Sequence, residues 1–242
     1  MSQLIWLDDS LEFPATQTAL EDPDGLLAVG GDLSVPRLIA AYRQGIFPWY
    51  SDGQPILWWS PSPRTVLMPS ELHIGRSNRK LLNTSPFTVT VDHAFEAVIQ
   101  HCAHAPREGQ DGTWITDEMM EAYIALHRAG HAHSVETWHN DHLVGGLYGV
   151  SLGAMFFGES MFSAVSGASK VAFMHFVHAL QQWGYAMIDC QMHTEHLAAF
   201  GAHNLPRHAF ESNLAAAINR EGCSDWPAAW SSRIPITTKG SA

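Results

Sequence analysis

The chain has 242 residues, of which 46% are hydrophobic and 15% are charged, a composition typical of a globular protein with a large core. Disordered chains have fewer apolar and more charged residues, so this composition excludes disorder over most of the length. The formal net charge of −11 argues against broad, non-specific binding to nucleic acid, which depends on Lys and Arg, but it allows a local basic patch.

Cysteine usage and the absence of targeting signals indicate a compartment. Cys102, Cys190 and Cys223 are far apart and odd in number, so they predict no disulfide framework. The first residues lack the basic segment and apolar run of a signal peptide. No stretch reaches the roughly eighteen apolar residues of a membrane-spanning helix. We therefore expect a soluble, cytoplasmic protein.

Residues 1–62 are rich in proline, glycine and tryptophan, and we expect them to form a small N-terminal domain. Ser34 as a cap and Pro36 in the first turn predict a helix over about 35–44. The aromatic and proline residues of Trp58-Trp59-Ser60-Pro61 predict a rigid loop that ends this domain.

From Arg64 the pattern becomes mixed, and residues 63–232 are expected to form one larger domain around a central sheet. In chain order we expect a strand over 88–91, a helix capped by Asp92, a helix from Thr116 to Gly130, strands over 134–138, 143–150 and 154–157, a helix over 170–183, a strand over 185–191 and a helix over 210–220. Residues 233–242 are expected to be a disordered tail.

The order strand, loop, helix, strand over 154–191 resembles the core of the acetyltransferase-like (GNAT) fold. The pattern alone supports an α/β or α+β fold with a central sheet. With the resemblance, we expect the α+β class, with a GNAT-like mixed sheet domain after the small N-terminal domain. No sequence of the kind that binds the coenzyme A pyrophosphate occurs between Ser163 and Lys170, so the resemblance does not imply acetyl-CoA.

Two polar residues end the last predicted strand. Asp189 and Gln191 are two apart, so we expect both side chains on one face, with Ile188 and Cys190 on the other. Buried polar groups need partners, and the pair is therefore a candidate site. Hydrogen bonding to a neighbouring loop is the alternative, and the strand pattern by itself favours it.

Gly158-Glu159-Ser160-Met161-Phe162-Ser163 is expected to end a strand and enter a polar loop. Glu159 could cap backbone N–H groups, hold a cation or act in acid–base catalysis. Arg76, Arg79 and Lys80, with Arg64 upstream, are the main group of cations. They suit either a phosphate backbone or a solvated helix face.

The histidines suggest no metal site, because no His-Glu-x-x-His motif and no pair of Cys-x-x-Cys motifs is present. Pairs such as His175 and His178 are more typical of surface or packing positions. A Walker A loop and a Gly-x-Ser-x-Gly elbow are also missing, which argues against NTPases and hydrolases.

Several motifs occur in an order that resembles one bacterial family, the leucyl/phenylalanyl-tRNA–protein transferases, from Phe13 to Arg207. They are Asp24-Gly25-Leu26-Leu27-Ala28-Val29-Gly30-Gly31-Asp32-Leu33, Gly45-Ile46-Phe47-Pro48-Trp49, Trp58-Trp59-Ser60-Pro61, Gly112-Thr113-Trp114-Ile115-Thr116, Gly158-Glu159-Ser160-Met161-Phe162-Ser163, Ala168-Ser169-Lys170 and Asp189-Cys190-Gln191. Each motif is weak alone, and their number and order carry the resemblance.

The resemblance implies transfer of Leu, Phe and, less readily, Met from aminoacyl-tRNA to proteins that begin with Arg or Lys. That transfer marks proteins for degradation in the bacterial N-degron pathway. It implies a reaction centre at Asp189 and Gln191, with Glu159 beside them, and tRNA contacts at Arg76, Arg79 and Lys80. It also implies a pocket for the aminoacyl side chain and the terminal adenosine, formed or bordered by Trp49, Trp114, Phe156, Met161, Phe173, Phe176 and Ile188.

The implied partners are Leu-tRNA, Phe-tRNA and the acceptor protein, and we expect a monomer that needs no membrane. Because the tRNA ester is already activated, the reaction requires no ATP, metal or other cofactor. Two alternatives stay open: a GNAT-like N-acyltransferase that uses acyl-CoA, and a non-catalytic tRNA-binding module.

Overall fold

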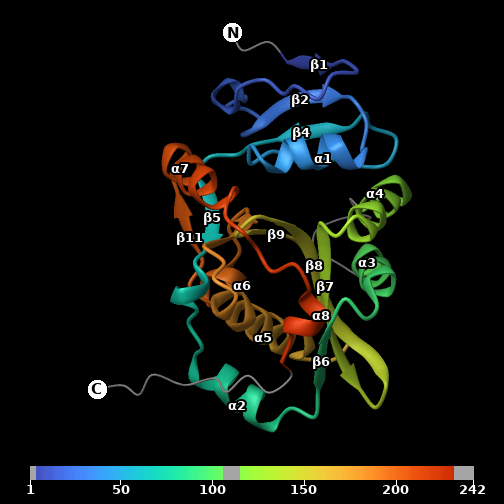
Figure 1. Ribbon diagram of the computed structural model, residues 1–242, viewed down its shortest axis with the longest axis vertical. Coiled ribbons are helices and arrows are strands. Elements are labelled where there is room, and N and C mark those ends of the chain that lie inside the picture. The colour runs from blue at the N-terminus through green and yellow to red at the C-terminus, as the bar shows by residue number, and fades with distance from the viewer. Residues whose placement is uncertain (1–3, 106–114, 232–242) are drawn as a thin grey trace.

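The computed structural model describes residues 4–105 and 115–231. They form two mixed sheets with helices packed around them (Figure 1). The predicted α+β class is confirmed, and the first sheet is built only from residues before Arg64. The tail predicted over 233–242 lies outside the described residues.

The smaller sheet has the strand order β1 (Ile5–Leu7), β2 (Leu26–Gly30), β4 (Leu57–Trp59) and β3 (Phe47–Pro48). β1 and β2 are parallel, and the other pairs are antiparallel. Helix α1 (Val35–Tyr42) starts where Ser34 and Pro36 predict it and lies between this sheet and the rest of the molecule (Figure 1). A short 3-10 helix, η1 (Thr16–Thr18), precedes β2.

The larger sheet holds the remaining strands, all antiparallel to their neighbours except one pair. Its spatial order is β11 (His203–Leu205), β5 (Arg64–Leu67), β10 (Met187–Gln191), β9 (Met155–Ser163), β8 (His142–Leu152), β7 (Ala132–His139) and β6 (Thr88–Val91). The parallel pair is β9 and β10, joined by helix α5 (Ala168–Gln182), because parallel strands need a crossover connection. The predicted strand–helix–strand unit is therefore confirmed.

Helices cover both faces of the larger sheet (Figure 1). α3 (Phe95–His104) and α4 (Asp117–Arg128) share one apolar core with α1, and α5 packs in a second core on the other face. The remaining helices are η2 (Pro69–Glu71), α2 (Arg76–Thr84), α6 (Glu195–Ala198), α7 (Arg207–Ala217) and α8 (Trp226–Ala229). None of the helices among the described residues has the length and apolar character to cross a membrane.

Helix-boundary predictions have mixed outcomes. Thr116 caps α4 as predicted, since its hydroxyl accepts a hydrogen bond from the Met119 N–H at 3.2 Å. The prediction that Asp92 caps the next helix is wrong. Asp92 has a φ of +53° and accepts a hydrogen bond from the Ser134 N–H at 2.9 Å, while α3 starts after Ala94. Asp92 therefore bonds the backbone of β7 and does not cap α3.

The loop predicted over 158–163 is also wrong, because β9 continues to Ser163. Its partner β8 pairs with it as far as Gly145 and Ser163, and this ladder satisfies the backbone despite the polar side chains. The pairing shifts register between Tyr148 and Gly149. Strand extension places Glu159 on a rigid element and not on a loop.

Two glycines that face each other in this ladder make a stability test. A Cβ at Gly149 would lie 2.2 Å from the Phe157 carbonyl oxygen, whereas a Cβ at Gly158 would meet an ordinary contact at 3.6 Å. Gly149→Ala should therefore lower the free energy of unfolding by about 1–3 kcal/mol or more. Gly158→Ala, the matched control, should change it little or raise it. Urea unfolding measures both, and equal effects would contradict the prediction.

Candidate active site

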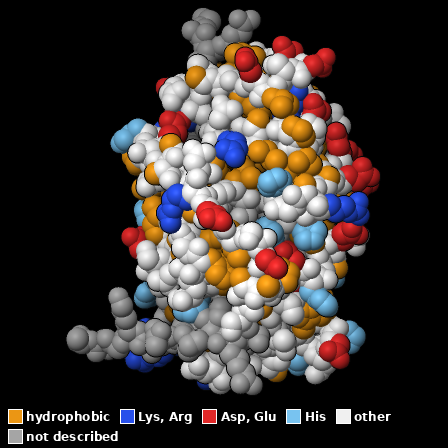
Figure 2. Space-filling model, viewed as in Figure 1, with side chains coloured by type: hydrophobic (Ala, Val, Ile, Leu, Met, Phe, Trp, Pro, Cys, Tyr) orange, Lys and Arg blue, Asp and Glu red, His pale blue; other side chains and the backbone are white. Residues whose placement is uncertain are grey.

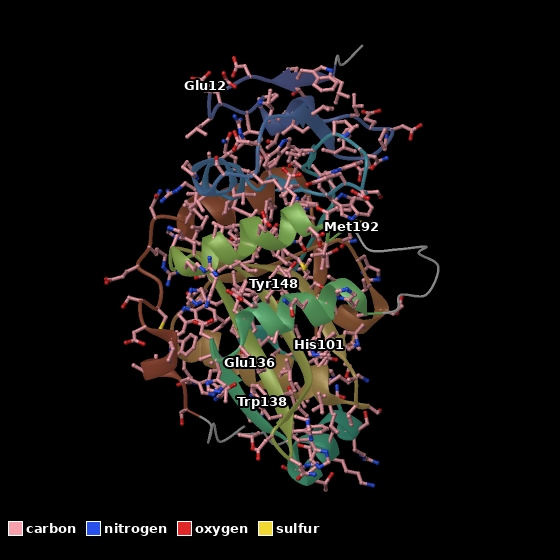
Figure 3. All side chains as sticks on the ribbon, turned by 90° about the vertical axis from the view of Figure 1, so that its right-hand side faces the viewer. Glu12, His101, Glu136, Trp138, Tyr148 and Met192 are labelled. Atoms are coloured by element: carbon pink, nitrogen blue, oxygen red, sulfur yellow. The ribbon has the colours of Figure 1, made fainter. Side chains whose placement is uncertain are left out.

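One cavity of about 530 Å³ lies where the larger sheet meets β3 of the smaller one, a size usual for sites that hold small organic groups. It is lined by Phe47, Pro48, Trp49, Leu147, Tyr148, Phe156, Gly158, Glu159, Ser160, Met161, Phe173, Phe176, Ile188, Cys190, Gln191, Met192, His193, Thr194, His196 and Leu197. Figure 3 labels two of these residues, Tyr148 and Met192. Tyr148 is fully buried and Met192 is 55% exposed, so the cavity runs from the interior to the surface.

The apolar wall matches the expected pocket. Trp49, Phe156, Met161, Phe173, Phe176 and Ile188 all line the cavity, and Trp114 lies outside the described residues. Phe156 and Phe176 pack edge to face, with ring centroids 4.6 Å apart. Because most of this wall is buried and has no hydrogen-bonding groups, it suits an apolar side chain of a ligand.

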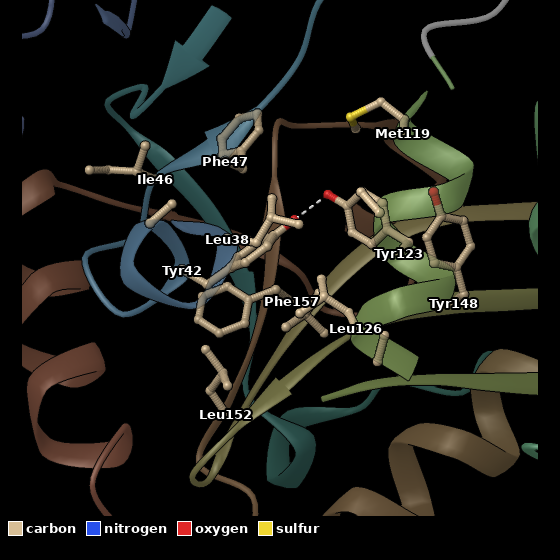
Figure 4. Close-up of a cluster of buried hydrophobic side chains, with 14 of the residues drawn as sticks. Leu38, Tyr42, Ile46, Phe47, Met119, Tyr123, Leu126, Tyr148, Leu152 and Phe157 are labelled. Atoms are coloured by element: carbon tan, nitrogen blue, oxygen red, sulfur yellow. Dashed lines mark hydrogen bonds between the residues drawn. The ribbon is translucent and has the colours of Figure 1, made fainter. Parts of the chain in front are cut away.

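Glu159 is the acidic residue among those that line the cavity, and the hydroxyl groups of two tyrosines contact its carboxyl group. Its Oε1 accepts a hydrogen bond from the Tyr42 hydroxyl at 2.6 Å, and its Oε2 accepts one from the Tyr123 hydroxyl at 3.0 Å. The two hydroxyls also bond each other (Figure 4). Three contacts need three hydrogens, and the phenols bring two. When Glu159 is protonated, its carboxylic acid donates to one of the two phenols, and each of the three contacts then has its own hydrogen.

The surroundings of Glu159 favour the same neutral form. The pKa of its carboxyl is raised to about 7, mainly by burial and to a smaller extent by the negative charge of Asp189, against the lowering by the two tyrosine hydrogen bonds and by the charge of Arg64. Burial and the charge of Glu159 also raise the pKa of Tyr42 and of Tyr123 well above the ordinary value. At neutral pH, Glu159 can therefore both give and take a proton.

Asp189 does not line the cavity. It is fully buried and forms a two-pronged ion pair with Arg64, with Nε to Oδ1 and Nη2 to Oδ2 both at 2.8 Å. Its Oδ1 also accepts a hydrogen bond from the backbone N–H of Gln191 at 2.9 Å. The carboxylate is thus neutralised by a cation and satisfied on both oxygens.

Gln191 does line the cavity, so the expectation that it shares a strand face with Asp189 is wrong. β10 shifts register against β5 between these two residues, and Gln191 has a φ of +55°. Such a bulge adds a residue to one strand and breaks the alternation of faces. Cys190 and Gln191 both reach the cavity as a result.

Three contributors were not recognised as site residues in the sequence. The sequence places Arg64 upstream of the cations Arg76, Arg79 and Lys80, but Arg64 is 1% exposed and forms an ion pair with Asp189. Tyr42 and Tyr123 lie on the buried faces of α1 and α4, where tyrosines are also ordinary core residues. A buried-face tyrosine on each of two helices was the only available signal, and it does not reveal that both hydroxyls meet Glu159.

The predicted phosphate-binding cations Arg76, Arg79 and Lys80 lie together on α2 and are exposed. None of them has an ion-pair partner among the described acids. On the face drawn in Figure 2, acidic side chains gather along the right-hand edge and Lys and Arg are few. α2 is therefore a local basic feature on an acidic body.

No group of three or more His, Cys, Asp or Glu side chains is placed to hold a metal ion within residues 4–105 and 115–231. His175 and His178 lie three apart on α5, and burial lowers the pKa of both. The polar side chains that line the cavity include those of Glu159, Gln191, Cys190, His193 and His196.

Comparisons with known proteins point in one direction. The family model described as leucyl/phenylalanyl-tRNA protein transferase matches residues 66–215, and the model of its N-terminal domain matches residues 31–62. A leucyl/phenylalanyl-tRNA–protein transferase of Teredinibacter turnerae is 59% identical over 99% of this chain and 93% of its own length. One of Stutzerimonas stutzeri is 57% identical over 93% of this chain and 100% of its own length.

Among solved structures, a GCN5-related N-acetyltransferase from Kribbella flavida covers 68% of this chain and 58% of its own, with 10% identity and a TM-score of 0.37. This score is too low to establish a shared fold. The GNAT-like arrangement therefore rests on the β9–α5–β10 unit of the chain itself.

Glu159→Gln should remove a pH-dependent loss of stability. The folded chain keeps a proton up to a pKa of about 7, whereas the ordinary value is 4.5, so unfolding releases a proton between these values. The free energy of unfolding should thus fall as pH rises through this window, by on the order of 3 kcal/mol, and the variant should lack that fall.

Urea titrations between about pH 4.5 and 8 measure the effect. Glu96→Gln, which removes an exposed carboxylate paired with Arg128, controls for the loss of one negative charge. Parallel stability curves for the wild type and Glu159→Gln would contradict a raised pKa for this carboxyl.

Proposed function

Because the chain belongs to the leucyl/phenylalanyl-tRNA–protein transferase family, we propose that it moves leucine or phenylalanine, and less readily methionine, from aminoacyl-tRNA to proteins that begin with Arg or Lys. The new N-terminal residue then marks the acceptor for the bacterial N-degron pathway. One observation carries the proposal: a single cavity joins an apolar wall to Glu159 and Gln191.

The apolar wall supports the choice of amino acid. Phe156, Phe173 and Phe176 are almost fully buried and can surround a Leu or Phe side chain without leaving polar groups unpaired. Met161 adds an unbranched, adaptable surface. A wall of this kind distinguishes side chains that differ by a methylene only modestly, so several apolar residues are accepted.

Gln191 aligns the attacking amine. The ester of aminoacyl-tRNA is already activated, so the enzyme must place a neutral α-amine about 3 Å from the carbonyl carbon and manage its proton. An amide is a very weak base, and Gln191 therefore accepts a hydrogen bond from the amine and does not remove its proton. Asp189 does not line the cavity, and its charge is paired with that of Arg64. It therefore acts through Gln191 and not directly on the substrate.

Glu159 manages the proton. As the C–N bond forms, its carboxylate takes a proton from the amine nitrogen, and as the C–O bond breaks, the carboxylic acid gives that proton to the ribose oxygen. Its pKa of about 7 allows both steps at neutral pH. The other role considered for Glu159, binding the basic side chain of the acceptor, requires it to stay ionised throughout.

The cations of α2 provide contacts to tRNA phosphates, and the reaction takes place in the cytoplasm, where charged tRNA is made. We also propose that the enzyme acts as a monomer. Arg76, Arg79 and Lys80 are free to approach a phosphate backbone because they are exposed and unpaired with described acids.

A transfer assay tests the activity. Labelled leucine should move from Leu-tRNA to a peptide that begins with Arg or Lys, and not to one that begins with Glu, and ribonuclease treatment of the Leu-tRNA should abolish transfer. Gln191→Ala should lower kcat by about 10-fold to 100-fold, because alignment is lost. Transfer from an acyl-CoA, or tight binding of Leu-tRNA with no transfer, would favour one of the two other functions.

A salt titration tests the tRNA contacts. Arg76→Gln together with Lys80→Gln should weaken tRNA binding and reduce the slope of log K against log salt by about 1.4–1.8, or 0.7–0.9 for each lost phosphate contact. Arg43→Gln, at another exposed arginine on the N-terminal side of the molecule, is the control and should leave the slope unchanged. An unchanged slope in the double variant would contradict tRNA phosphate contacts at Arg76 and Lys80.

A further inference from the structure

We propose that Arg64 is a positioning residue for transfer: acting through Asp189, it holds the backbone turn that brings the Gln191 side chain to the cavity wall. This inference rests on the role of Gln191 proposed above. It gives Arg64 a function different from that of the exposed cations, and it explains why Asp189 matters without facing the substrate.

The ion pair fixes the orientation of the Asp189 carboxylate as well as balancing its charge. Two nitrogens of the Arg64 guanidinium meet the two oxygens of Asp189, each at 2.8 Å, and both side chains are at most 1% exposed. Parallel hydrogen bonds of this kind fix the rotation of the carboxylate, which a single point charge such as a lysine ammonium does not.

The same carboxylate then reaches the backbone of Gln191. Asp189 Oδ1 accepts the Gln191 N–H at 2.9 Å, so one oxygen bonds both Arg64 Nε and this amide. The amide belongs to a residue with a φ of +55°, in the left-handed region that a residue with a Cβ seldom adopts. Fixing the carboxylate therefore fixes the turn.

Two aromatic rings hold the guanidinium in place. Its central carbon lies 4.7 Å from the ring centre of Phe47 and 4.8 Å from that of Phe210. Phe47, on β3, also lines the cavity, and Phe210 lies on α7. Arg64 thus ties the smaller sheet, α7 and the end of β10 together beneath the cavity wall.

A purely stabilising role explains this arrangement less well. Desolvation of two buried charges offsets most of their attraction, and a well-packed apolar pair often gives equal or greater stability. The remaining guanidinium nitrogen, Nη1, has no hydrogen-bond partner among the described residues, which adds to the cost. What an apolar pair could not supply is an oriented acceptor for the Gln191 N–H.

A double-mutant cycle tests the inference. Arg64→Lys keeps the positive charge but loses the two parallel hydrogen bonds to Asp189. It should therefore lower kcat by about 10-fold to 100-fold with the KM for Leu-tRNA nearly unchanged. In the Gln191→Ala background the same substitution should cause no further loss of kcat, because Arg64 acts only through Gln191. An equal fold-loss of kcat in both backgrounds would overturn the inference.

Arg37→Lys is the matched control. Arg37 is also a fully buried arginine paired with an aspartate, Asp32 at 3.1 Å, but neither residue lines the cavity. This variant should lower the melting temperature and leave kcat unchanged. Asp32 is 54% exposed, so the control tests the loss of a buried guanidinium's ion pair and not of a fully buried pair. A comparable fall of kcat in Arg37→Lys would show that disturbing any buried arginine suffices, and would contradict a specific role of Arg64.

If Arg64→Lys does not fold, Asp189→Asn provides the same cycle from the other side of the ion pair, since asparagine is similar in shape and loses the charge. Its loss of kcat should again disappear in the Gln191→Ala background. A wild-type protein that transfers no leucine would refute the proposed function. A wild type that transfers leucine, with additive losses in the cycle, would refute the role of Arg64 alone.

Discussion

The buried ion pair between Arg64 and Asp189 is the interaction on which the arrangement of the cavity depends. It joins β5 to β10 at the register shift between Asp189 and Gln191. At this shift the Asp189 carboxylate accepts the hydrogen bond of the Gln191 backbone N–H. Phe47 and Phe210 enclose the cation, so the smaller sheet and α7 share in the same contact. The polar wall of the cavity is in this way fixed by residues that do not all face it.

The carboxyl group of Glu159, which lines the cavity, has the opposite environment. Asp189 is neutralised by a fixed cation, whereas Glu159 meets two phenols that donate hydrogen bonds but carry no charge. Burial then dominates and brings its pKa to about 7. The two carboxyl groups thus have different environments: Asp189 lies outside the cavity in an ion pair with Arg64, and Glu159 lines the cavity with a pKa close to neutral pH.

Much of the fold follows from local patterns, and the errors have definite causes. The apolar spacing in 170–183, the Thr116 cap and the strand over 88–91 are read correctly because each depends on neighbours within a few residues. Asp92 and the segment 158–163 are misread because pairing with β7 and β8 decides their conformation. Six of the pocket residues that the family resemblance implies, Trp49, Phe156, Met161, Phe173, Phe176 and Ile188, line one cavity, and so do Glu159 and Gln191, whereas Asp189 does not.

From the sequence, periodicity indicates a fold with helices around a central sheet, and motif order indicates the family, because neighbouring residues carry both signals. The family resemblance in turn implies the apolar pocket residues. The directions of Asp189 and Gln191 and the partners of Glu159 depend instead on contacts between distant segments. A one-residue bulge reverses the faces of a strand, and it is stabilised by Arg64, 125 positions earlier in the chain. The partners of Glu159 likewise come from two separate helices, α1 and α4, so no local pattern could reveal its proton affinity.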